Sequence, residues 1–72
     1  MSDLIELEER VRAALAIAGF PSGYVSPSVN EPGKVRLTGV VQDPMEKFAA
    51  EVAAFEVEGV ESVESQIKIA GS

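Results

Sequence analysis

The chain has 72 residues, and twelve acidic against six basic side chains give it a net charge of −6. This length is typical of one domain, which we expect over residues 1–72 with a core at about 4–70. Nucleic-acid phosphates require a basic face, so the acidic balance argues against a nucleic-acid partner. Neither Cys nor His is present, which excludes disulfides, thiolate metal sites and the usual catalytic triads.

The amino-terminal segment is not typical of an export signal. Residues 1–10 carry four acids and one base, with no basic region followed by a continuous apolar stretch. No segment approaches the roughly 20 apolar residues that span a bilayer. We therefore expect a cytoplasmic protein.

Residues 3–18 have the pattern of an amphipathic helix. Apolar side chains recur on one stripe at helical spacing: Leu4, Leu7, Val11, Ala14, Leu15 and Ala18. Gly19 suits the left-handed position after a helix, and Pro21 prevents continuation. The helix is therefore predicted to end near Ala18.

Two strands joined by a tight turn are predicted next. Residues 24–30 form a weak strand, and Pro27 places it at an edge because proline cannot donate to a ladder. Pro32 and Gly33 suit the two central positions of a type II turn. In the return strand, residues 34–41, three apolar side chains share one face: Val35, Leu37 and Val41. Gly39 in this strand indicates a bulge or a close approach by a helix.

Asp43 and Pro44 give the clearest helix start in the chain. Asp43 is predicted to be the N-cap, Pro44 the first helical residue, and Glu46 completes a capping box. An apolar stripe is predicted to face the core and consists of Met45, Phe48, Ala49, Val52 and Phe55. The side chains expected to face water are Glu46, Lys47 and Glu51, and Gly59 is expected to end the helical segment.

The last strand is predicted over residues 63–69, where apolar and polar side chains alternate. The element order is then αββαβ, an α+β fold in which two helices pack on one face of a three-stranded mixed sheet. Because βαβ crossovers are right-handed, the last strand should run parallel to the second.

Three segments in order resemble the BON domain family. They are Gly33-Lys-Val-Arg-Leu-Thr-Gly39, Asp43-Pro-Met-Glu-Lys-Phe-Ala-Ala50, and Val57-Glu-Gly-Val-Glu-Ser-Val63 followed by Gln66-Ile-Lys-Ile69. They match a strand ending in a Leu-Ser/Thr-Gly step, a helix with central alanines, and a Gly-Val-x-x-Val turn into a last strand. The resemblance covers about residues 4–70 and implies a non-enzymatic binding module, often one attached to phospholipid.

Within that family, Gly19-Phe-Pro21 and Gly59-Val-Glu-Ser-Val-Glu-Ser-Gln-Ile-Lys68 resemble the BON half of cytosolic potassium-binding proteins that also carry a LysM module. This resemblance implies a potassium ion as ligand, and no other cofactor is expected. A monovalent ion can be held by backbone carbonyls, which are unpaired at helix ends. The candidate positions lie in two loops: Gly19, Phe20, Gly23, Gly59 and Val60.

Two further functions remain open from the sequence. One is a membrane-associated scaffold that binds phospholipid, and the other is a docking module for a protein or a neighbouring domain of a longer chain. No catalytic motif supports an enzyme. The positions assigned a structural role are Gly39, Asp43, Pro44 and Gly59.

Overall fold

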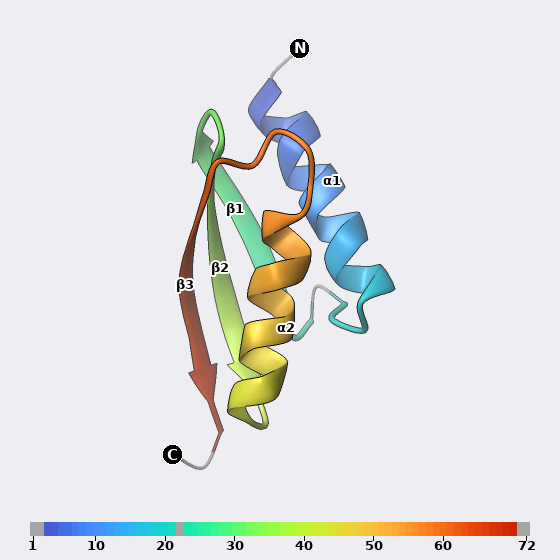
Figure 1. Ribbon diagram of the computed structural model, residues 1–72, viewed down its shortest axis with the longest axis vertical. Coiled ribbons are helices and arrows are strands. Elements are labelled where there is room, and N and C mark those ends of the chain that lie inside the picture. Colours follow the sequence, from blue (N-terminus) through green and yellow to red (C-terminus); the bar gives the residue numbers. More distant parts are fainter. Residues whose placement is uncertain (1–2, 22, 71–72) are drawn as a thin grey trace.

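The computed structural model describes residues 3–21 and 23–70, which form two helices and three strands. Their bounds are α1 (Asp3–Ile17), β1 (Val25–Glu31), β2 (Lys34–Val41), α2 (Pro44–Phe55) and β3 (Ser62–Ile69). The sheet order is β1-β2-β3, with β1 antiparallel and β3 parallel to β2. Both helices lie on one face of the sheet (Figure 1). The predicted α+β fold and the parallel last strand are confirmed.

The core lies between the two helices and the sheet. Leu7, Val11 and Leu15 are the buried side chains of α1, as the helical stripe predicted. They pack with apolar side chains of all three strands, which are Val25, Val29, Val35, Leu37, Val41 and Ile67. Burial of each Val or Leu contributes about 1.5–3 kcal/mol, so this cluster is the main source of stability.

The predicted core face of α2 is wrong. The residues of α2 that are fully buried are Ala50 and Ala54, while all five residues of the predicted stripe are exposed. Lys47 and Glu51, expected in water, are half-buried and form an ion pair of 3.6 Å between Nζ and Oε2.

The small side chains of α2 explain this orientation. Ala50, Ala53, Ala54 and Val57 also recur at helical spacing, so the helix has two apolar stripes. The sheet is narrow and shares its covered face with α1, whose Leu and Val side chains already fill much of the core. Alanines let α2 approach the sheet closely, whereas buried phenylalanines would overpack that space.

The start of α2 resembles the predicted capping box, except that the return bond of Glu46 goes to the residue before the N-cap instead of to the N-cap itself. Asp43 is the N-cap, and its Oδ1 accepts a hydrogen bond from the Glu46 amide at 2.9 Å. The Glu46 carboxylate in turn accepts from the Gln42 amide at 2.7 Å. Pro44 follows the cap at a position where no amide is required. Local sequence therefore determines where this helix starts.

A close approach at Gly39 is confirmed, but the approaching segment is not a helix, and Gly39 does not lie at a bulge. Both ladders pass through Gly39 in unbroken register, and the register shift lies between Val29 and Glu31. The backbone beside Gly39 is that of Tyr24, at the entrance to β1. The tight turn between β1 and β2 has Gly33 at φ +77°, as a type II turn requires.

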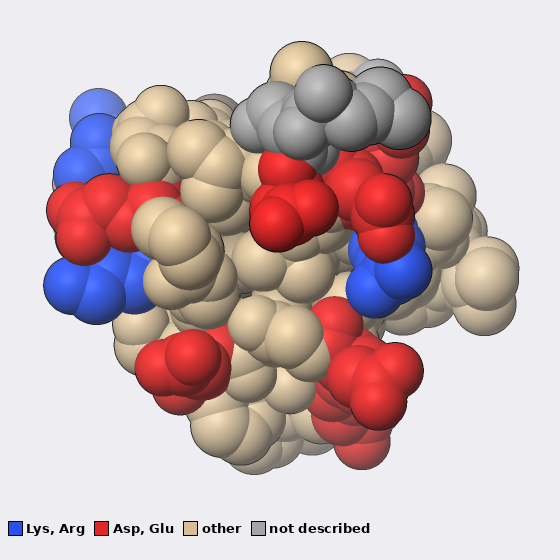
Figure 2. Space-filling view, turned by 90° about the horizontal axis from the view of Figure 1, so that it is seen from above, with Lys and Arg blue, Asp and Glu red and all other residues tan. Residues whose placement is uncertain are grey.

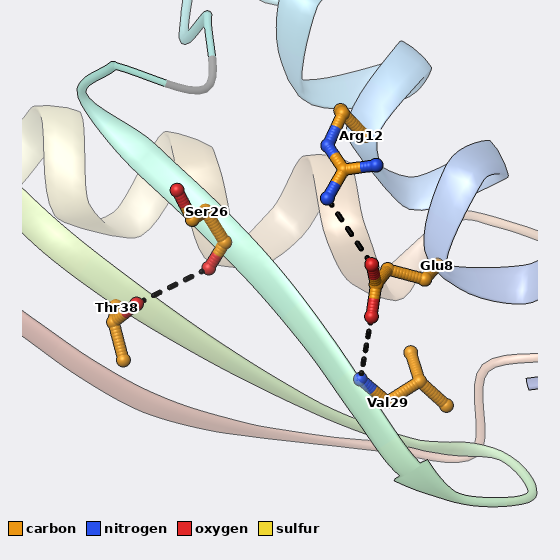
Figure 3. A network of polar contacts seen from close by, with 5 residues as sticks. All are labelled: Glu8, Arg12, Ser26, Val29 and Thr38. Carbon is orange, nitrogen blue, oxygen red and sulfur yellow. Dashed lines mark hydrogen bonds and ion pairs between the residues drawn. The ribbon is translucent and has the colours of Figure 1, made fainter. Parts of the chain in front are cut away.

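The outer edge of β1 is protected along its length. The Val25 amide donates to the Pro21 carbonyl at 3.3 Å, and Pro27 has no amide hydrogen. The Val29 amide donates to Glu8 Oε1 at 3.4 Å, and the same carboxylate contacts Arg12 on α1 (Figure 3). These three positions leave no row of outward amides with which another strand could pair.

Candidate functional site

The first loop assigned to cation binding is a tight cap after α1. Gly19 has φ +99°, and its amide donates to the Ala16 carbonyl at 3.1 Å. The Phe20 amide donates to the Leu15 carbonyl at 2.7 Å, and the Phe20 ring is buried in the core. Carbonyls at the end of α1 are thus already engaged by the loop itself.

The second loop lies at the other end of the molecule. Gly59 has φ +101°, and a Cβ built on it would lie 3.4 Å from Leu7 Cδ1, near the start of α1. Val60 donates its amide to the Val57 carbonyl at 3.1 Å. Because Gly19 follows the end of α1, the structure separates the two predicted loops by the length of that helix (Figure 1). A single ion cannot contact both.

Acidic side chains do not gather into a metal-binding cluster. Among residues 3–21 and 23–70, no group of three or more His, Cys, Asp or Glu side chains is placed to hold a metal ion. At the end of the molecule seen in Figure 2, carboxylates lie in several separate places, and some of them adjoin basic side chains. Among residues 3–21 and 23–70, no polar or charged residue is buried as a whole, although the Ser65 hydroxyl oxygen is.

The most distinctive surface is an apolar stripe on α2, hereafter the α2 stripe. It consists of Met45, Phe48, Val52 and Phe55, which are 76%, 63%, 37% and 58% exposed. The spacing places these side chains on one side of the helix, opposite Ala50 and Ala54. Contiguous exposed apolar surface of this kind marks interaction sites more often than single exposed residues do.

A groove runs beside this stripe, between α2 and β3. Its volume is about 620 Å³, and α2 contributes Glu51, Val52, Phe55 and Glu56. The wall formed by β3 and the residue before it consists of Glu61, Ser62, Val63 and Ser65. The groove therefore has apolar side chains on both walls and three carboxylates around them. We call it the α2–β3 groove.

Sequence reasoning named the residues of this surface but assigned them to the core. The signal was the helical spacing of Met45, Phe48, Val52 and Phe55, which is the same for a buried and a docking stripe. The sequence also contains the second stripe of Ala50, Ala53 and Ala54, and this alternative core face was the signal that could have corrected the assignment.

This arrangement defines a small α+β domain with an uncovered apolar helix face and without clustered catalytic groups among its described residues. The sequence model of the BON domain matches residues 3–71, nearly the whole chain. The chain therefore belongs to the BON domain family, whose members are generally non-catalytic modules that bind phospholipids or proteins. No curated protein matches it. In the described part of the chain, no helix is long and apolar enough to cross a membrane.

Proposed function

We propose that this chain is a non-catalytic binding module that docks another protein through the α2 stripe. The observation that carries the proposal is the exposure of two phenylalanines, Phe48 and Phe55, on a helix whose buried face is alanine. Aromatic side chains dominate the energetics of protein interfaces because each buries a large apolar area on binding.

The charge around the stripe favours a protein over a membrane. Glu51 and Glu56 border it on α2, and the whole chain carries a net charge of −6. The cytoplasmic leaflet and other anionic lipid surfaces attract basic segments, so they would repel this acidic rim. A protein partner can instead supply basic side chains that match the rim.

A site-specific photo-crosslinker tests this proposal in cells that express the chain. Benzoylphenylalanine would replace Phe48 in one variant and Tyr24 in the control, whose exposure is 62% against 63% for Phe48. We expect a discrete protein adduct at position 48 that is absent at position 24. Lipid adducts at position 48, or the same products at both positions, would contradict protein docking.

Potassium sensing stays a second hypothesis, supported by the resemblance to the potassium-binding subgroup and by the acidic charge. Since Gly19 and Gly59 lie at opposite ends, an ion would have to bind at one loop alone. An amide NMR titration with potassium chloride, against sodium chloride at equal ionic strength, tests it. Saturable shifts in one loop with potassium only would support the hypothesis, and equal shifts would reflect screening and exclude it.

A further inference from the structure

The two edges of the sheet differ in what covers them. At β1, the amides of Val25 and Val29 donate to a loop carbonyl and to the Glu8 carboxylate, and Pro27 has no amide hydrogen. At the opposite edge, β3 has β2 as its one neighbour within the described sheet. An uncovered edge strand is a template for pairing with another chain, and proteins usually block it unless it is used.

The hydrogen bonds of β3 determine which of its amides point outward. The Ser62 and Ala70 amides donate to carbonyls on the β2 side, at 3.1 Å to Gly33 and 2.7 Å to Val41. Backbone direction alternates along a parallel ladder, so the amides between them that point away from β2 include those of Val63, Ser65 and Ile67. None of these three amides donates a hydrogen bond to a described residue.

Two of these residues, Val63 and Ser65, also line the α2–β3 groove, whereas Ile67 belongs to the core. Val63 and Ser65 line the groove together with Val52 and Phe55, so the free edge and the apolar groove form one continuous surface. Ser65 Oγ is buried and has no hydrogen-bond partner among the described residues. An unpaired buried hydroxyl costs about 1–3 kcal/mol, which a polar group of an occupant could offset.

The charge of the groove indicates its occupant. Glu51, Glu56 and Glu61 surround the apolar walls, and no basic residue lines the groove. A second copy of this chain would bring the same carboxylates together, which is unfavourable. Alternate side chains of a strand added to β3 would face this groove, so an extended segment fits it when those groove-facing side chains include apolar residues for the walls and basic residues for the acidic rim.

We propose that β3 accepts an extended, basic and apolar segment of a partner protein as a fourth strand of the sheet. The partner's backbone pairs with the outward amides of Val63, Ser65 and Ile67, and its apolar side chains occupy the α2–β3 groove. Lysine or arginine side chains at other groove-facing positions of the segment contact Glu56 and Glu61, while Glu51 is paired with Lys47. This proposal rests on the proposed docking function and specifies the partner's chemistry and backbone conformation.

The test uses a synthetic lysine–valine peptide, in which valine and lysine occupy the groove-facing positions and threonine the positions between them; it is added to the full chain and followed by amide NMR and hydrogen exchange. We expect saturable shifts at Val63, Ser65 and Ile67. Exchange of these amides should slow about tenfold, the effect of a net hydrogen bond of about 1.4 kcal/mol. The amides of Val25 and Val29, at the blocked edge, should not respond.

Two control peptides separate backbone pairing from general attraction. A glutamate–valine peptide keeps the strand tendency but reverses the charge. A lysine–valine peptide with methylated backbone nitrogens keeps the charge but loses its donors, and its methyl groups prevent close pairing with β3. Both should fail to slow exchange at β3. Equal protection by either control, or no response to the lysine–valine peptide, would overturn the proposal.

Two variants of the chain make the test specific to this edge. Ser65→Pro removes an outward amide without removing a hydrogen bond to β2, and Pro27 occupies an equivalent outward position in β1. The variant should therefore fold, and its affinity for the peptide should fall at least tenfold. Glu56→Lys should weaken peptide binding several-fold, whereas Glu9→Lys on α1 should not. Circular dichroism verifies the fold of each variant.

The outcomes distinguish this inference from the docking function. Peptide shifts confined to Phe48 and Phe55 would overturn strand addition and leave docking through the α2 stripe intact. Concentration-dependent shifts of the β3 amides without peptide would assign the edge to a second copy and overturn the basic partner. A missing protein adduct at position 48 would contradict docking itself, whatever the peptide does.

Discussion

Gly39 and Tyr24 lie so close that a Cβ built on Gly39 would be 2.0 Å from the Tyr24 carbonyl oxygen. The same Cβ would lie 2.9 Å from Val25 Cα, and Gly39 has φ +147°, which side chains rarely adopt. Because both neighbours are backbone atoms, neither can rotate away. Glycine at this position thus holds the entrance of β1 against the end of β2.

Replacing Gly39 with alanine should destabilise the chain by about 3 kcal/mol or more, from backbone strain and overpacking together. Urea unfolding measures the loss as a lower midpoint. Gly23→Ala is the matched control, because nothing lies within 4 Å of its Cβ position. Equal midpoints for the two variants would show that the close approach at Gly39 does not exist in solution.

The orientation of α2 can be tested by exchanging large and small side chains. Ala50→Leu should cost about 1–3 kcal/mol, because Ala50 is fully buried against the sheet. Phe48→Ala should change the free energy of unfolding by less than about 0.5 kcal/mol, because its ring already faces solvent. A large loss of unfolding free energy for Phe48→Ala, together with a small loss for Ala50→Leu, would show that the phenylalanines face the core.

The N-cap of α2 should contribute measurably to the free energy of unfolding. Asp43→Ala removes the acceptor of the Glu46 amide and should cost about 1 kcal/mol in thermal or urea unfolding. Asp43→Asn keeps an acceptor oxygen and should restore most of that loss. If asparagine were no better than alanine, the hydrogen bond to Glu46 would not be the stabilising contact.

Glu8 should control hydrogen exchange at the edge of β1. Glu8→Ala removes the acceptor of the Val29 amide, so exchange at Val29 should become about tenfold faster relative to Val25, the effect of losing about 1.4 kcal/mol of protection. Glu8→Gln retains an amide oxygen and should preserve most of the protection. Unchanged exchange in Glu8→Ala would mean that another group blocks this edge.

Local signals in the sequence were enough to determine the elements of this protein. The caps at Asp43 and Pro44, the turn at Gly33 and the alternation in β3 each act over a few residues, so their meaning does not depend on distant parts of the chain. The placement of Pro27 at an edge follows from its missing amide alone.

The tertiary structure decided which surfaces remain free. Two apolar stripes compete for the core in α2, and the choice depends on the volume that α1 leaves above a narrow sheet, which no local pattern encodes. Likewise, Glu8 protects β1 from 21 residues away along the chain, while the amides of Val63, Ser65 and Ile67 in β3 donate to no described residue. Element identity is thus a local property, whereas exposure of Phe48, Phe55 and the β3 edge results from long-range packing.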